Sequence, residues 1–319
     1  MTNVDIYTIC QELNDLLVGA RVDKSFQPTK DTVVMRFHKA GTGRLDLVIQ
    51  AGKRIHLSQY PLTNPQNPPS FPMLLRKIVK GANVVSVEQH NFDRVVEIKM
   101  KKEETYTLIV ELFSQGNIIL LNESNEIILP LKRKHWSDRD ISSKKEYVFP
   151  IENGINPITL TIDEFKEIVA AGEDEEIVRI LATNGLGSLY AEEIMLNTEI
   201  SKKTACSSLS AEEINIIFNA LKSVFEPLEK RQFNPMIVNN EKEVEKLKQE
   251  NPDKKYKTKE DVISINLSQY EGFEVEGFES FNEACDEFYS SKVKNEITGI
   301  QEAAWNKKVS KFSKRLEKQ

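Results

Sequence analysis

The stretch NVVSVEQHNFDRVVEIKM, residues 83–100, decides the fold of the first half of this 319-residue chain. Apolar and polar residues alternate along 83–88 and again along 95–100, which predicts two strands. His90 and Asn91 between them are typical of a turn. Asp93 and Arg94 then set an acid beside a base, between apolar neighbours, at the start of the second strand. The stretch therefore predicts an antiparallel strand pair that carries a charged pair near its turn.

Asp93 and Arg94 are the first candidate site residues. A carboxylate acceptor and a forked guanidinium donor on one rigid strand end suit a phosphate, a ribose or a base edge. Taken alone, the pair is better explained as a solvated surface ion pair that adds little stability. The surrounding pattern of elements favours a binding role.

The same alternation predicts further strands on both sides of this pair, and helical spacing predicts two helices. Helices are expected over Val4–Val18, with Asn3 as cap and Asp5 in the first turn, and over Phe71–Val79. Short strands with tight turns, flanked by two helices, indicate a sandwich or a strongly bent sheet. The further strands are expected at Thr32–Phe37, Leu45–Gln50, Arg54–Leu57, Tyr106–Phe113, Asn117–Leu121 and Glu126–Leu131.

From Thr161 onward the pattern becomes helical, with Asn184-Gly185-Leu186-Gly187-Ser188 between the second and third helices. Glycine, an apolar residue and glycine between two helices form the helix-hairpin-helix signature. Gly185 and Gly187 allow a tight turn, and the next helix can direct its first amides at a phosphate. A plain helix connection would use similar residues. The expected helices are Ile162–Ala171, Glu175–Leu181, Tyr190–Leu196 and Ala211–Phe225.

The remaining chain predicts strands at Ile263–Gln269 and Gly272–Phe278 that return to the first domain, and then a helix from Phe281. Apolar residues spaced along a charged helix after Ile297 predict the base of a longer coiled coil, cut at Gln319. The predicted class is α+β, with a strand-rich domain (1–158), a helix-hairpin-helix domain (159–228), a return segment (229–280) and the coiled-coil start (281–319).

Acidic residues outnumber basic ones, 49 to 43, so nucleic-acid binding would have to come from local patches. One patch is Arg76, Lys77 and Lys80 on a predicted helix. The other is Lys132, Arg133, Lys134 and Arg139, with Trp136 available to stack on a base. Such runs can also be solvated faces, or can cover a sheet edge.

Three scattered cysteines predict reduced, buried thiols, and with four scattered histidines they offer no zinc site. We therefore expect no metal and no cofactor. The first residues lack the pattern of a signal peptide, and no apolar run reaches transmembrane length. These features predict a cytoplasmic protein without membrane contact.

Taken together, the segments resemble the NFACT family of RqcH-like, NEMF-like and fibronectin-binding protein A-like chains. The order of many short motifs over nearly the whole chain carries the resemblance. They are Glu12-Leu13-Asn14, Gly19-Ala20-Arg21-Val22, Pro72-Met73-Leu74-Leu75-Arg76-Lys77, Lys80-Gly81-Ala82, Phe92-Asp93-Arg94, Glu111-Leu112-Phe113 and Gly116-Asn117-Ile118-Ile119-Leu120.

The resemblance implies a first domain folded like the formamidopyrimidine DNA glycosylases, then a helix-hairpin-helix domain and a coiled coil. It implies a ribosome-associated quality control factor that binds the large ribosomal subunit carrying peptidyl-tRNA. Such factors recruit charged tRNA for untemplated C-terminal tailing, with alanine in the prokaryotic branch. The functional acid of the family matches Asp5, and its Asp-Arg pair matches Asp93 and Arg94. The coiled coil implies self-association.

Two other classes of protein share features with this sequence. A DNA glycosylase of this fold uses an N-terminal proline amine with a neighbouring glutamate, whereas Met1 is followed here by Thr2 and Asn3. The four-cysteine zinc finger of those enzymes is also missing, so we expect a binding protein and not an enzyme. An extracellular adhesin would need a signal peptide or an anchor.

Overall fold

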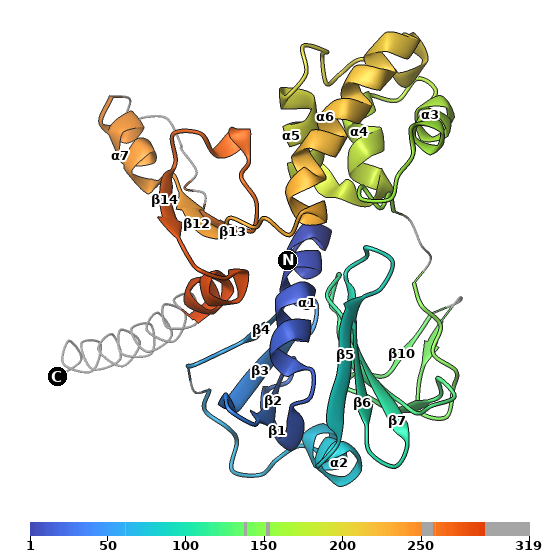
Figure 1. Cartoon of the computed structure of the whole chain (residues 1–319), viewed down its shortest axis with the longest axis vertical. Helices are drawn as coiled ribbons and strands as arrows, with labels where there is room; N and C mark the ends of the chain where they lie inside the picture. Colours follow the sequence, from blue (N-terminus) through green and yellow to red (C-terminus); the bar gives the residue numbers. More distant parts are fainter. Residues whose placement is uncertain (61, 137–138, 151–153, 251–257, 259, 291–319) are drawn as a thin grey trace, which may run out of the picture.

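The computed structural model describes residues 1–290 except 61, 137–138, 151–153, 251–257 and 259. A strand-rich part and a helical part lie at opposite ends, and helix α1 (Asn3–Leu17) runs from their junction into the strand-rich part (Figure 1). The predicted coiled coil after Ile297 lies outside the described residues. The predicted α+β class is confirmed.

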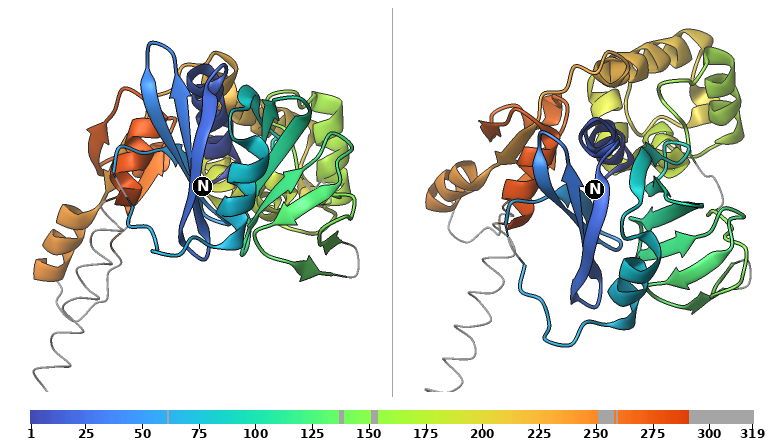
Figure 2. Two further views of the ribbon diagram at one scale, coloured as in Figure 1. Left: turned by 90° about the horizontal axis from the view of Figure 1, so that it is seen from below. Right: turned by 60° about the horizontal axis from the view of Figure 1, so that its bottom comes forward.

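Nine antiparallel strands form one sheet in the order β4-β3-β2-β1-β5-β6-β7-β8-β9. Strands β1 and β5 share a single register pair, Arg21 with Asn83, so the sheet bends there into two halves (Figure 2). The strands are β1 (Arg21–Thr29), β2 (Thr32–Lys39), β3 (Gly43–Gln50), β4 (Arg54–Leu57), β5 (Asn83–Gln89), β6 (Val95–Lys101), β7 (Thr105–Glu111), β8 (Asn117–Leu121) and β9 (Ile127–Pro130).

Helix α1 fills the space between the two halves. Ile6, Ile9 and Leu13 are buried in a core shared with both halves of the sheet. The predicted cap Asn3 was wrong by one residue, because Thr2 is the N-cap. The Thr2 hydroxyl accepts a hydrogen bond from the Asp5 amide at 3.2 Å, and the Asp5 carboxylate accepts one from the Thr2 amide at 2.7 Å.

Helix α2 (Ser70–Val79) packs against β1 and is confirmed, as are the predicted strands of the large sheet. Strand β1 itself was not predicted. Its pairing with β2 is irregular after Val22 and after Phe26, and these irregularities break the period of two that alternation requires. Strands β10 (Lys134–His135) and β11 (Asp140–Ile141) form a separate short ribbon.

The four predicted helices of the second part are confirmed. They pack around a core that includes Phe165, Tyr190 and Phe225, all less than 2% exposed. They are α3 (Ile162–Ala171), α4 (Ile177–Leu181), α5 (Gly187–Leu196) and α6 (Ala211–Glu229), joined by η1 (Ala182–Leu186) and η2 (Cys206–Ser208).

The third segment forms its own small sheet, in which β12 (Met236–Asn239) pairs with β13 (Glu260–Ile263) and β14 (Glu274–Gly277). The predicted strand Ile263–Gln269 was wrong, because β13 ends at Ile263 and Ser268–Tyr270 form η3, whereas the strand predicted at Gly272–Phe278 is confirmed as β14. Both β13 and β14 pair with β12 and with no strand of the large sheet. Contact with the first part is through side chains: Ile237 and Val262 belong to its core. Between these strands lie α7 (Glu241–Glu250) and η3 (Ser268–Tyr270), and residues 281–290 are helical.

Candidate nucleic-acid interface

A cleft of about 530 Å³ lies where the β5–β6 turn, the start of α1 and the α4–α5 connection meet. We call it the hairpin cleft. It brings together four of the predicted site residues from distant positions, Asp93, Arg94, Gly185 and Gly187. The other lining residues are Met1, Thr2, Asn3, Phe113, Pro150, Ala182, Thr183, Leu186, Ser188 and Leu189.

The β5–β6 turn is held by Phe92. Asn91 and Phe92 adopt left-handed backbone angles, φ 43° and 57°, which a bulky residue rarely does. Phe92 is 5% exposed and packs in the core of the helical part, with its ring centroid 5.9 Å from that of Tyr7. This burial stabilises the turn and fixes the direction of Asp93 and Arg94. The sequence motif contained Phe92, but its anchoring role was not predicted.

Asp93 and Arg94 do not form an ion pair with each other among the described residues. The Asp93 carboxylate accepts a hydrogen bond from the Arg94 backbone amide at 2.6 Å, which leaves its second oxygen at the cleft. The Arg94 side chain is exposed, and within the described part of the chain it makes no hydrogen bond or ion pair. Its guanidinium is therefore available to an anionic ligand.

Asp5 lies behind the cleft and not in its wall. Its side chain is buried, with the residue 5% exposed, so direct contact between Asp5 and tRNA, which the family resemblance implied, is not possible in this arrangement. Burial raises the pKa of Asp5 to about 6, against the opposing effects of the N-terminal amine and the hydrogen bonds with Thr2. Because Thr2 lines the cleft, Asp5 can act on it only by positioning Thr2.

Gly185 and Gly187 line the same cleft as Arg94. Both have positive φ, 93° and 74°, which explains glycine at these positions. The Gly185 carbonyl accepts a hydrogen bond from the Asn3 side chain at 2.9 Å and so ties the helical part to α1. No side chain caps the start of α5 at Leu186, and the Gly187 amide donates to the Ala182 carbonyl. The next amides of this ten-residue helix have no side-chain cap, and a helix start of this kind near an arginine suits a phosphate.

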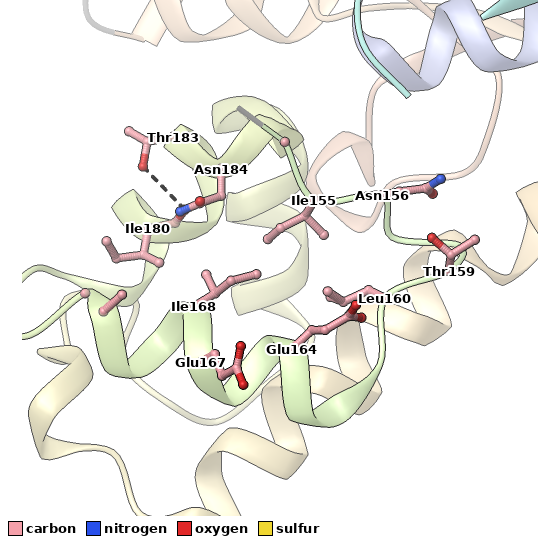
Figure 3. Close-up of a pocket in the computed structure, with 13 residues that line it drawn as sticks. Ile155, Asn156, Thr159, Leu160, Glu164, Glu167, Ile168, Ile180, Thr183 and Asn184 are labelled. Atoms are coloured by element: carbon pink, nitrogen blue, oxygen red, sulfur yellow. Dashed lines mark hydrogen bonds between the residues drawn. The ribbon is translucent and has the colours of Figure 1, made fainter. Parts of the chain in front are cut away.

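A second hollow of about 720 Å³ lies on the other side of η1, between α3 and residues 154–160 (Figure 3). Thr183 lines both spaces. Glu164 and Glu167 of α3 line this hollow, and its lining includes no lysine or arginine. Carboxylates without cations repel phosphate, so the hairpin cleft is the better candidate for nucleic acid.

In the second predicted basic patch, Arg139 and Lys132 already form ion pairs within the protein. Arg139 is only 9% exposed, and its guanidinium bonds the buried Glu111 carboxylate at 2.6 Å. The predicted RNA contact by Arg139 is therefore contradicted, because its charge is already paired inside the protein. Lys132 bonds Asp31 at 2.6 Å and the Gln115 carbonyl at 2.8 Å.

The other patch residues remain accessible, but the two patches do not join. Lys134 lies 5.2 Å from the centre of the Trp136 ring, and Arg133 is exposed. Arg76 and Lys77 lie on α2, which leads into the start of β5, whereas the hairpin cleft lies beyond its end. In Figure 1, α2 is at the bottom of the sheet, far from the N-terminus of α1.

The bent sheet around α1, with a helix-hairpin-helix unit docked at the β5–β6 turn, defines a two-part α+β protein with a cleft at the junction. A family model described as NFACT N-terminal and middle domains matches residues 2–319. The chain belongs to the NFACT family.

Three relatives illustrate the match. The archaeal Rqc2 homolog aRqcH of Methanocaldococcus jannaschii is 36% identical over 330 residues, which cover 100% of this chain and 45% of the relative. The ribosome quality control complex subunit NEMF of Homo sapiens is 26% identical, over 91% of this chain and 28% of its own length. RqcH of Bacillus subtilis is 25% identical, over 98% of this chain and 54% of its own length. The chain thus spans about half of these relatives, or less.

Two solved structures share the fold. The fibrinogen binding protein from Staphylococcus aureus superposes with a TM-score of 0.69 at 23% identity, over 91% of this chain and 99% of the other. The N-terminal part of the fibronectin/fibrinogen-binding protein from Streptococcus suis gives 0.67 at 23% identity, over 91% and 98%. Across the described residues, no helix combines the length and apolarity needed to span a membrane.

Proposed function

We propose that this chain is the tRNA-contacting part of a cytoplasmic ribosome-associated quality control factor. In this proposal it binds the large ribosomal subunit carrying peptidyl-tRNA. It recruits tRNA, with a preference for alanyl-tRNA, for untemplated C-terminal tailing. The names of the relatives from Methanocaldococcus, human and Bacillus support the ribosome quality control role. We propose a binding role with no catalytic residue and no cofactor.

The hairpin cleft is the observation that carries the proposal. Arg94, which has no ion pair or side-chain hydrogen bond among the described residues, meets the Asp93 carboxylate there, next to the start of α5, which no side chain caps. The guanidinium can donate to a phosphate, and the Asp93 oxygen can accept from a ribose 2′-hydroxyl, a group that RNA has and DNA lacks.

The Arg94→Ala variant tests the proposal. Loss of one charge-assisted contact costs about 1.5–3 kcal/mol, so we expect tRNA affinity to fall roughly tenfold to a hundredfold. The measurement is binding of labelled tRNA by fluorescence anisotropy, together with the melting temperature. That temperature should hold, because the Arg94 side chain has no bonding partner among the described residues.

The matched control is Arg179→Ala, which removes the same charge from an exposed position on α4 outside the cleft. It should leave tRNA affinity within about twofold. Equal losses in the two variants, or a collapse of the melting temperature in Arg94→Ala alone, would contradict the proposal. Binding of labelled fibrinogen that depends on Arg94, with no tRNA binding, would favour the role named for the Staphylococcus aureus structure.

A further inference from the structure

Another concave surface, of about 820 Å³, lies at the opposite end of β5 from the hairpin cleft. We call it the α2 groove. Three separate segments supply its five cations: β1, helix α2 with its C-cap, and the β6–β7 turn. The cationic lining residues are Arg21, Arg76, Lys77, Lys80 and Lys102, and the others are Val22, Asp23, His38 and Gly81.

The five cations of the groove are uncompensated. Among the described residues none of them forms an ion pair, and the one lining carboxylate, Asp23, forms none either. Other basic residues on the same sheet are paired: Lys99 with Glu88 at 3.3 Å, and Arg36 with Asp46 at 2.8 Å. In a chain of net charge −6, acidic residues outnumber basic ones. A basic groove without ion pairs is therefore a local feature that an anionic partner would stabilise.

Backbone carbonyls hold both arginines in place. The Arg76 Nε donates to the Ser25 carbonyl at 2.8 Å, and its guanidinium lies 5.1 Å from the centre of the Phe26 ring. The Arg21 Nε donates to the Gly81 carbonyl at 3.2 Å. These bonds use Nε and orient the guanidinium groups in advance, which reduces the entropy lost on binding a phosphate.

Gly81 provides the room that Arg21 needs. Its φ is 84°, and a Cβ at this position would lie 3.2 Å from Nη2 of Arg21. The glycine therefore permits both the turn after α2 and the close approach of the guanidinium.

The helix dipole does not account for the whole groove. Arg76 and Lys77 lie in the last turn of α2, where cations complement the carbonyl end of the helix. Arg21, however, lies on β1, and Lys102 lies on the β6–β7 turn. Neither residue belongs to the last turn of α2. Both nevertheless line the same hollow.

We propose that the α2 groove binds the phosphate backbone of an RNA segment other than the one at the hairpin cleft. The seven residues of β5 place the two surfaces about 20 Å apart. A concave lining fits a rod-like phosphate backbone, whereas a flat bilayer would touch only its rim. This surface goes beyond the proposed function, because it needs no contact at Arg94.

The test uses the full chain and a labelled RNA duplex of about 16 base pairs, at about 50 and 200 mM KCl. The Lys77→Ala/Lys80→Ala/Lys102→Ala variant should bind at least tenfold more weakly at low salt. Its log–log salt dependence should be shallower by about 2.7, because three phosphate contacts on a duplex are lost. The Lys203→Ala/Lys246→Ala/Lys248→Ala control removes the same charge from exposed positions elsewhere and should stay within about twofold of the unmodified chain.

Equal losses in the two triple variants would overturn the proposal, since net charge alone would then explain binding. Groove-dependent binding to phosphatidylserine vesicles without an effect on RNA would overturn it in favour of a membrane. The triple substitution should weaken the duplex by the same factor in the Arg94→Ala background. If Arg94→Ala has no effect on tRNA while the groove variant still loses the duplex, the proposed function fails and the groove stands.

Discussion

Asp5 is a buried carboxyl group whose charge is costly but locally useful. Its oxygen accepts the Thr2 amide at the first turn of α1, one layer behind the hairpin cleft. Burial is the largest influence and raises its pKa to about 6, above the value of about 4 expected in the unfolded chain. The folded state therefore holds this proton more tightly than the unfolded state does.

The pH dependence of stability follows from that difference. The contribution of Asp5 to the free energy of unfolding is full below about pH 4 and is lost as the pH rises through about 6. Two pKa units correspond to about 3 kcal/mol. In Asp5→Asn, which keeps an acceptor for Thr2, this component should vanish. Urea unfolding at about pH 4.5 and 7.5 measures it as a double difference between the two proteins.

Asp15→Asn is the matched control, an exposed acid on the same helix, and its double difference between the two pH values should be smaller than that of Asp5→Asn. If the free energies of unfolding of wild type and Asp5→Asn differ by the same amount at both pH values, then Asp5 does not titrate in this range.

The sequence identifies charged residues, but it does not show which of them are free. Arg94 and Arg139 both follow an aspartate or lie in a basic run, and both were predicted to bind RNA. Arg94 is exposed and without a partner among the described residues, whereas Arg139 is buried against Glu111, 28 residues away. Pairing over such a separation depends on the register of β7 and on the path of the loop, and neither can be read from composition.

At the scale of elements, Glu12 of α1 caps the N-terminus of the helix over residues 281–290. Its two carboxylate oxygens accept the amides of Phe281 and Asn282, each at 2.7 Å. Asn282 in turn accepts the Leu57 amide of β4 at 2.6 Å. These bonds cap the late helix and hold it against the first part of the chain, although 269 residues separate Glu12 from Phe281.

Glu12→Ala should release this helix start. Loss of a cap with two charge-assisted hydrogen bonds costs about 2 kcal/mol, and the effect should be concentrated in the amides of residues 281–284. Hydrogen exchange followed by mass spectrometry should show faster exchange in that segment. Asp15→Ala, one turn along the same helix and exposed, is the control and should leave it unchanged. Uniform loss of protection over the whole chain would mean that Glu12 does not act as a local cap.

Elements with a strong period were predictable, and irregular ones were not. Helix α3 was predicted with its observed bounds, Ile162–Ala171, because its apolar residues repeat at helical spacing. Strand β1 was missed because irregular pairing disrupts its alternation, and α7 because few apolar residues mark its buried face. The hairpin cleft depends on Phe92, whose burial against the helical part is a tertiary contact.

At the scale of the whole molecule, α1 connects the parts. Ile6, Ile9 and Leu13 are in the core of the bent sheet, whereas Val4 belongs to the core of the helical part. The Thr8 hydroxyl donates to Ser264 at 3.0 Å, which adds the third segment. One helix thus contributes to every part, and loss of its packing should destabilise all of them.

Leu13→Ala tests whether these parts unfold together. Leu13 is 0% exposed, so truncation should leave a cavity and cost about 2–5 kcal/mol. If α1 couples the parts, hydrogen-exchange protection should fall by the same free energy in peptides from 83–121 and from 162–229. Leu16→Ala, the same change at a position 38% exposed on the same helix, should cost less than about 1 kcal/mol. Protection that falls only in 83–121 would show that the helical part unfolds independently. In that case α1 contacts both parts at the hairpin cleft but does not couple their unfolding.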